Sequence, residues 1–271
     1  MKTPDYTAGE AFQTEKRTVF SSDWLPLCAE AQIGRSGDFL AASVGGWSVV
    51  GVRDGEGIVR VLRNACRHQN MQVVGTPSGN CQSFRCRFHG WTYDLRGHFL
   101  SAPAPVAPKD PQSADLHLAS LATTTVSGVV FFSLSSPSAI PDIAMDLPAY
   151  GGTSVTDIAC NWKVCVEHLL AEHEPSPDFL WRWPLLSVRQ AGSLVIVEQV
   201  VPHTFLRTRL FTHVFGGAVD EHAQAAGLIK QACEQLQADR ASGVMCAKDS
   251  TLVADFHRRL ASVYAQEAAA T

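Results

Sequence analysis

The sequence predicts an α+β protein in which a domain of short antiparallel strands precedes a second domain of sheet and helices. Residues 38–62 alternate between β-rich runs and two hairpin signals, Gly45-Gly46 and the Asp-Gly-Glu-Gly run at 54–57. Residues 185–215 supply two or three further β-rich runs. Three later segments have helical patterns, at residues 161–172, 220–239 and 249–268.

The end of the first domain is marked by turn-forming residues. Four prolines within residues 101–111 predict an extended connector. Residues 116–134 then read as strands that close the same domain, with residues 128–132 as its buried strand. The Ser- and Pro-rich run at 135–150 is a boundary.

Local signals fix the ends of the three predicted helices. The first stops before Pro175 and Pro177, since proline cannot continue a helix. The other two open on Asp220 and Asp249, and each aspartate is a candidate N-cap.

Composition limits the class of protein. The chain has 271 residues, of which 46% are hydrophobic and 18% charged, and a net charge of -4. This length suits one large domain or two modest ones. The mildly acidic balance without a basic tract argues against nucleic acid as a partner. We find neither a signal peptide nor an apolar run long enough to span a bilayer, so we expect a cytoplasmic protein without membrane contact.

Two Cys/His pairs stand out, Cys66-x-His68 and Cys86-x2-His89, with seventeen residues between them. Two thiolates and two imidazoles on two loops match the needs of a Rieske [2Fe-2S] centre, in which the cysteines bind one iron and the histidines the other. The alternative is a structural zinc site. Zinc fingers pair Cys with Cys and His with His, whereas each loop here offers one of each. The pattern therefore favours the cluster. We expect the other cysteines to be buried thiols, namely Cys28, Cys81, Cys160, Cys165, Cys233 and Cys246.

The region around these pairs resembles the Rieske domain of ring-hydroxylating oxygenase large (alpha) subunits. The resemblance rests on Cys66-Arg67-His68, on the run CRFHGWTY at 86–93, and on Gly97, Pro103 and Pro105 further along. Rieske proteins of respiratory complexes carry an extra cysteine in each loop, and both extra cysteines are missing here. The resemblance thus points to the oxygenase or ferredoxin branch, with a potential toward the lower end of the Rieske range, about -150 mV.

The same resemblance implies a domain plan. An antiparallel β Rieske domain, residues 24–140, would be inserted into a helix-grip (START-like) domain of antiparallel sheet plus helices, made of residues 1–23 and 141–271. The second domain would be a shortened version of the oxygenase catalytic domain.

Relatives of this kind also hold a mononuclear Fe(II) with two histidines and one carboxylate. The helix that begins at Asn161-Trp162-Lys163 resembles the one that carries these ligands, but the ligands are out of register. Without a gap their positions fall on Ala171, Glu174 and Phe179, of which only Glu174 could bind a metal. With a gap or an alternative alignment the candidates are His168, His173, Asp178 and Asp249. Asp249 can equally be a helix N-cap.

Two functions stay open. In the first, the chain is a Rieske-type oxygenase component that takes electrons from a ferredoxin or flavoprotein reductase for O2-dependent hydroxylation or demethylation of a small organic, possibly aromatic, substrate. In the second, it is a non-catalytic electron-transfer or assembly subunit. The resemblance implies a head-to-tail homotrimer or a hetero-oligomer with a related subunit. No residue selects a particular substrate.

Several arginines lie in or beside the two loops although the chain is net acidic: Arg63, Arg67, Arg85, Arg87 and Arg96. Solvated arginines are common on protein surfaces. A positive rim around a redox site would also attract an acidic ferredoxin and speed its association.

Overall fold

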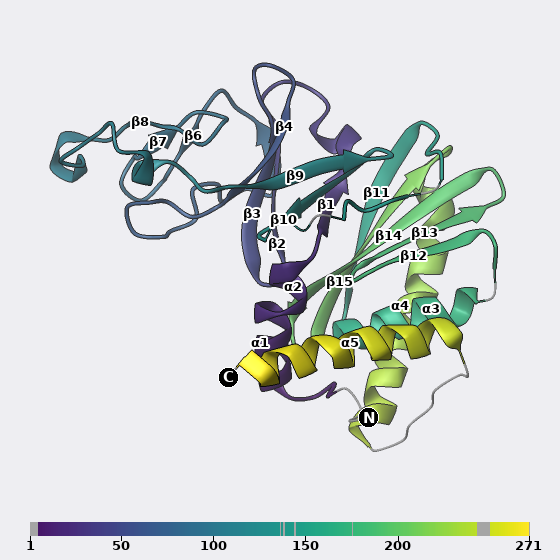
Figure 1. The fold of residues 1–271 in the computed structure, drawn as a ribbon. Coiled ribbons are helices and arrows are strands. Elements are labelled where there is room, and N and C mark those ends of the chain that lie inside the picture. The colour runs from purple at the N-terminus through teal and green to yellow at the C-terminus, as the bar shows by residue number, and fades with distance from the viewer. Residues whose placement is uncertain are drawn as a thin grey trace. The chain divides into compact units, whose positions relative to one another are not determined.

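The structure is a computed structural model that describes residues 5–135, 137, 139–143, 145–174, 176–242 and 250–270. The chain divides into two compact units (Figure 1). We call residues 26–138 the β unit, and residues 1–25 together with 139–271 the mixed unit.

The β unit is built on two antiparallel sheets. The larger has the order β1-β10-β9-β4-β3-β2-β5, and the smaller has the order β6-β7-β8. The larger sheet contains β1 (Leu25–Ala29), β2 (Asp38–Val44), β3 (Trp47–Arg53), β4 (Val59–Arg63), β5 (Ser78–Asn80), β9 (Ser120–Val126) and β10 (Val129–Ser133). The smaller contains β6 (Phe84–Arg85), β7 (Thr92–Tyr93) and β8 (Phe99–Ser101). Short 3-10 turns lie at Glu30–Ile33, Ala104–Val106 and Ala114–Leu116.

The predicted hairpins are present. Gly45 and Gly46 have φ of 56° and 81° in the turn between β2 and β3, a conformation that glycine adopts without strain. Between β3 and β4 the Asp54 carboxylate accepts hydrogen bonds from the Glu56 and Ile58 amides, both at 2.9 Å. All five residues of β10 are buried, as the sequence predicted for this strand.

The mixed unit contains a five-stranded antiparallel sheet of order β11-β15-β14-β13-β12. Its strands are β11 (Tyr150–Ile158), β12 (Phe179–Arg182), β13 (Leu186–Ala191), β14 (Leu194–Thr204) and β15 (Arg207–Phe215). Its helices are α1 (Gly9–Arg17), α2 (Val19–Ser22), α3 (Trp162–His173), α4 (Ala223–Ala241) and α5 (Thr251–Ala270), with a 3-10 turn at Val219–His222. Within the described part of the chain, no helix has both the length and the apolarity needed to cross a membrane.

The helix ends only partly follow the prediction. The helix predicted from residue 161 is present as α3, and Asn161 is its N-cap, because its side-chain oxygen accepts from the Lys163 amide at 3.0 Å. The expected cap at Asp220 is wrong: a 3-10 turn occupies Val219–His222, and α4 starts at Ala223 without a side-chain cap. Asp249 lies outside the described residues.

A buried ion pair joins three helices of the mixed unit. The Glu15 carboxylate on α1 contacts the Lys163 ammonium on α3, and both side chains are fully buried. Trp162 Nε1 and the Tyr264 hydroxyl each donate to the same carboxylate at 2.6 Å. Every polar atom of this cluster thus has a partner, which a buried charge pair requires in order to be tolerated.

The remaining cysteines are mostly as predicted. Cys28, Cys160, Cys165 and Cys233 are buried free thiols. Cys81 is only partly buried, because it follows the short edge strand β5. Cys246 lies outside the described residues.

Candidate metal centre

The first Cys/His pair lies on a tight loop, residues 66–71, that follows β4 by two residues. The Cys66 amide donates to the Met71 carbonyl at 2.8 Å, and the Asn70 amide donates back to the Cys66 carbonyl at 2.7 Å. Asn70 has a φ of 56°, the left-handed conformation that asparagine tolerates better than most residues. The loop therefore closes on itself and directs residues 66 and 68 to one side.

The second pair lies on a loop with the same hydrogen-bond pattern, residues 86–91. The Cys86 amide donates to the Trp91 carbonyl at 2.8 Å, and the Gly90 amide donates to the Cys86 carbonyl at 2.9 Å. Gly90 has a φ of 72°, and a Cβ there would lie 3.1 Å from the Pro103 ring. Two loops of equal length and like backbone geometry thus present one cysteine and one histidine each.

Both cysteines are buried, each with 1% of its surface exposed. The Cys66 sulfur lies 3.2 Å from the Tyr93 hydroxyl, which also accepts from the Arg67 amide at 3.1 Å. Burial raises the pKa of the Cys66 thiol, and the neighbouring Cys86 sulfur raises it further. A pair of thiolates at this position therefore requires a compensating positive charge, such as a bound metal ion supplies.

The two imidazoles face each other at the edge of this site. The ring centroids of His68 and His89 are 4.6 Å apart with an interplanar angle of 86°. His68 stacks on Trp91 at 5.1 Å, and the Trp91 indole donates to the Val106 carbonyl at 3.0 Å. The His68 ring is thus held in place by an indole that is itself anchored.

One nitrogen of His68 shows whether the two cysteines and two histidines fit a metal site. His68 Nδ1 is buried and has no hydrogen-bond partner among the described residues. An unsatisfied buried polar atom costs about 1 to 3 kcal/mol, and coordination to a metal ion would satisfy it. The four side chains therefore fit a metal–sulfur cluster.

In the described part of the chain no three His, Cys, Asp or Glu side chains converge on a position for a single metal ion. A Rieske cluster takes two protein ligands at each iron, so its four ligands need not meet at one point.

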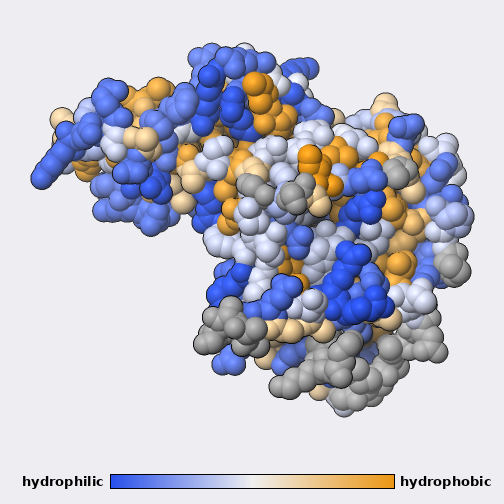
Figure 2. All heavy atoms as spheres, viewed as in Figure 1, coloured by the Kyte–Doolittle hydropathy of each residue, from blue (hydrophilic) through white to orange (hydrophobic). Residues whose placement is uncertain are grey.

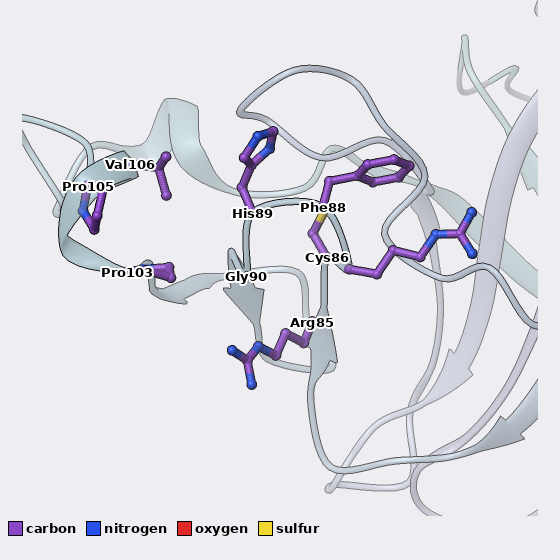
Figure 3. A pocket seen from close by; sticks show the side chains of 9 residues that line it. Arg85, Cys86, Phe88, His89, Gly90, Pro103, Pro105 and Val106 are labelled. Atoms are coloured by element: carbon purple, nitrogen blue, oxygen red, sulfur yellow. The ribbon is translucent and has the colours of Figure 1, made fainter.

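The surface beside the second loop is open. A hollow of about 660 Å³ is lined by Arg85, His89 and Pro103 among others (Figure 3). Phe88 on the same loop is 45% exposed. In Figure 2 the lobe that carries β6–β8 is mainly hydrophilic, with separate apolar residues among the polar ones. Because His68 and His89 are only partly buried, this end of the β unit gives access to the imidazoles rather than to the cysteines.

The candidates for a mononuclear iron are placed differently. His168 and His173 both lie on α3 and line one pocket of the mixed unit. The His173 ring packs on Phe179 at 5.2 Å between centroids. Asp178 is exposed in the turn before β12, and its backbone carbonyl accepts from the Gln190 amide at 2.9 Å. Asp249 is outside the described residues.

Two further carboxylates near α3 already have partners. Glu174 accepts from the amides of Thr251 and Leu252, both at 3.1 Å, and so caps the start of α5. Glu167 is buried and accepts from the Tyr6 hydroxyl at 2.5 Å, with His257 Nε2 at 2.8 Å. Neither carboxylate is left to bind a metal in this arrangement.

Comparison with known proteins decides the nature of the β unit. Residues 23–123 match the family model described as "Rieske [2Fe-2S] domain". These residues are a Rieske [2Fe-2S] domain. Biphenyl 2,3-dioxygenase subunit alpha of Rhodococcus jostii (strain RHA1) is 38% identical over 98 residues, which are 36% of this chain and 21% of that protein. Biphenyl dioxygenase subunit alpha of Paraburkholderia xenovorans (strain LB400) is 28% identical over 191 residues, which are 62% of this chain and 42% of that protein.

This Rieske-domain chain is therefore related to the alpha subunits of ring-hydroxylating dioxygenases, and it spans less than half the length of those relatives. Solved structures share the fold over most of the chain. The apo form of the quaternary ammonium Rieske monooxygenase CntA aligns with a TM-score of 0.73 at 18% identity, over 88% of this chain and 84% of that one. Apo dicamba monooxygenase aligns with a TM-score of 0.68 at 16% identity, over 94% of this chain and 100% of that one.

Proposed function

We propose that Cys66 and Cys86 bind one iron of a [2Fe-2S] cluster, that His68 and His89 bind the other, and that the chain is an electron-accepting component of a Rieske oxygenase system. The observation that carries this proposal is the pair of matching loops that bring two buried thiols and two facing imidazoles together. When bound, such a cluster takes up and releases one electron at a time.

The surrounding residues have separable tasks in this proposal. Burial of the cysteines keeps water from the thiolates. The Tyr93 hydroxyl donates to the Cys66 sulfur, since a ligating thiolate has no proton to give. A hydrogen bond to a ligand sulfur stabilises added negative charge and so favours the reduced state. The partly exposed imidazoles form the natural exit for the electron and can carry a proton with it.

Mixed ligation predicts a specific spectrum. We expect the reduced protein to show a rhombic electron paramagnetic resonance signal, because one iron has thiolate and the other imidazole ligands. His89→Cys should move the spectrum toward that of a plant-type ferredoxin and lower the potential, since a thiolate adds negative charge. A protein that contains zinc, lacks sulfide and shows no paramagnetic signal after reduction would refute the assignment.

We propose a ferredoxin or flavoprotein reductase as the electron donor, and the arginines near the loops support an acidic one. Arg67, Arg85 and Arg87 are exposed and have no ion-pair partner among the residues that the structure describes. The Arg85→Gln/Arg87→Gln double variant should be reduced by an acidic ferredoxin roughly three- to tenfold more slowly at low salt, with the difference vanishing at high salt. Stopped-flow reduction over a range of ionic strength measures this.

A matched control is available for the donor experiment. Arg96 pairs with Glu56 and lies 3.9 Å from Asp54, so its charge is already balanced. Arg96→Gln should therefore change the reduction rate much less. Two results would contradict electrostatic docking of the donor: a wild-type reduction rate that does not depend on salt, or an equal decrease of the reduction rate in the double variant and in Arg96→Gln.

A second candidate function is oxidation of a small organic substrate with O2 at a mononuclear Fe(II) in the mixed unit. The observation that favours it is that His168 and His173 line the same pocket, about 590 Å³ in volume. If they bind iron, His173→Ala should lower the iron content by one atom per chain and leave the cluster spectrum intact, because the cluster lies in the other unit. If the iron content were unchanged in both His173→Ala and His168→Ala, the oxidation function would be rejected and only the electron-transfer function would remain.

We also propose a trimeric or hetero-oligomeric assembly, which sedimentation of the purified protein tests.

A further inference from the structure

The pocket of the mixed unit is lined by both apolar and polar residues. It lies between α3 and α4 next to β13, and encloses about 590 Å³, within the usual range for small-molecule sites. Its large apolar lining residues are Leu169 on α3 and Leu228 and Ile229 on α4, which we call the apolar wall. Leu228 is 62% exposed, more than any other large apolar side chain in the described part of the chain. A ligand with an apolar body would cover this surface.

The polar side of the pocket is built around Arg189 on β13. Its side chain is 12% exposed, and its Nε lies 3.6 Å from Glu198 Oε1 on the neighbouring strand β14. A terminal nitrogen of Arg189 contacts His222 Nε2, which lines the same pocket. Glu198 is fully buried and accepts from the Ser187 hydroxyl at 2.9 Å through its other oxygen. The strands therefore hold the guanidinium in place before any ligand binds.

The ion pair between Arg189 and Glu198 lacks a direct hydrogen bond. Neither Arg189 Nε nor Glu198 Oε1 makes a hydrogen bond within the described residues, although both atoms are buried. A guanidinium has five N–H donors in a rigid fork, and a carboxylate can accept from two of them at once. Glu198 balances the charge of Arg189 from the sheet side, while the guanidinium also lines the cavity.

The other titratable residues that line the pocket do not cancel the positive charge of Arg189. Glu172 is the one carboxylate among the lining residues, and it is exposed, so water screens it. A guanidinium only donates hydrogen bonds, so the His222 Nε2 atom that Arg189 contacts carries no proton and the His222 ring adds no positive charge. Arg189 is thus the one arginine or lysine among the lining residues, and its side chain is only 12% exposed, which strengthens an electrostatic interaction.

We infer that this pocket binds a small organic carboxylate, with Arg189 holding the carboxylate group and the Leu169/Leu228/Ile229 wall holding the apolar body. The inference concerns the mixed unit and requires neither the cluster nor a mononuclear iron. It goes beyond both proposed functions by naming the chemical class of the ligand.

Three isosteric probes test the ligand class with the full-length, cluster-loaded, oxidised protein. Titration calorimetry with 2-naphthoate, 2-naphthamide and 2-naphthamidine compares an anion, a neutral molecule and a cation of nearly one shape. We expect 2-naphthoate to bind roughly tenfold or more tightly than the amide, and the amidine to bind most weakly. Equal binding of acid and amide would show an apolar cavity only, and a preference for the amidine or no binding of any probe would overturn the inference.

Variants identify the residue responsible. Arg189→Lys keeps the charge beside Glu198 but loses the fork, so we expect naphthoate binding to weaken about tenfold and amide binding to stay the same. Arg189→Met/Glu198→Met removes both charges together and so leaves no uncompensated buried carboxylate. It should bind acid and amide equally while its thermal unfolding remains cooperative.

The matched control is Arg209→Lys on β15, whose partner Asp157 is exposed. This variant should bind naphthoate like the wild type. Retained naphthoate affinity in both Arg189 variants would contradict the inference. Because binding is measured without an electron donor, a failure of the cluster assignment would appear as missing iron and sulfide, whereas a failure of this inference would appear only in the titrations.

Discussion

Replacing Cys86 with serine should abolish the [2Fe-2S] cluster. Cys86 is 1% exposed at the start of the second loop, and its sulfur faces that of Cys66. An alcohol is a much weaker ligand than a thiolate for iron in a cluster. We expect purified Cys86→Ser to lose the visible absorbance of the wild type together with nearly all of its iron and sulfide, measured on the same protein concentration.

Cys81→Ser is the matched control, since Cys81 lies five residues earlier in the same unit and is free and partly buried. This variant should retain the absorbance and the metal of the wild type. If Cys86→Ser kept its cluster while Cys81→Ser lost it, the assignment of the two loops would have to be abandoned.

Removing the carboxylate of Glu15 should cause the largest loss of stability in the mixed unit. Glu15→Ala leaves the Lys163 ammonium fully buried without a counter-charge, and it takes the acceptor from Trp162 Nε1 and the Tyr264 hydroxyl. Breaking one side of a buried ion pair costs about 3 to 5 kcal/mol. Denaturant unfolding followed by circular dichroism measures this loss in the free energy of unfolding.

An exposed ion pair on the same helix provides the comparison. Arg17 pairs with Glu267 at 3.0 Å, but its side chain is 63% exposed. Arg17→Ala should cost about 0 to 1 kcal/mol, because water and salt screen such pairs. A loss for Glu15→Ala no greater than that for Arg17→Ala would show that the buried pair contributes little to stability.

The local parts of the fold and of the centre were predictable from sequence. The Gly45-Gly46 turn, the buried run of β10 and the helix that starts after Asn161 depend on residues close together in the chain. The Cys/His pairs depend on spacing within two short loops. Such features are set by backbone preferences and by nearby side chains, so a single sequence contains them.

Features that depend on distant segments were missed. Strand β11 contains Gly151-Gly152 and reads as a weak strand, but pairing with β15 stabilises it. Tyr93 reaches Cys66 across 27 positions, and nothing in its own neighbourhood signals this contact. Trp91 and Tyr93 belong to the run at 86–93 that carried the family resemblance, but no contact was assigned to either side chain.

The mixed unit shows the same limit for charged residues. Glu174 fell on a ligand position of the ungapped alignment, yet it caps α5, which begins 77 residues later at Thr251. In the register of β13 and β14, Glu198 lies opposite Ser187 and Arg189 lies opposite Ile196, and only this register makes Arg189 and Glu198 diagonal neighbours. A carboxylate or guanidinium in a sequence does not reveal its partner when the partner lies on another strand or helix.

The most direct test of the cluster assignment is the iron and acid-labile sulfide content of the purified protein, expressed per chain. The assignment predicts two sulfides and two irons per chain, held by Cys66, Cys86, His68 and His89. A third iron with the same two sulfides would add the mononuclear site of the second candidate function. One zinc per chain without sulfide would contradict the assignment.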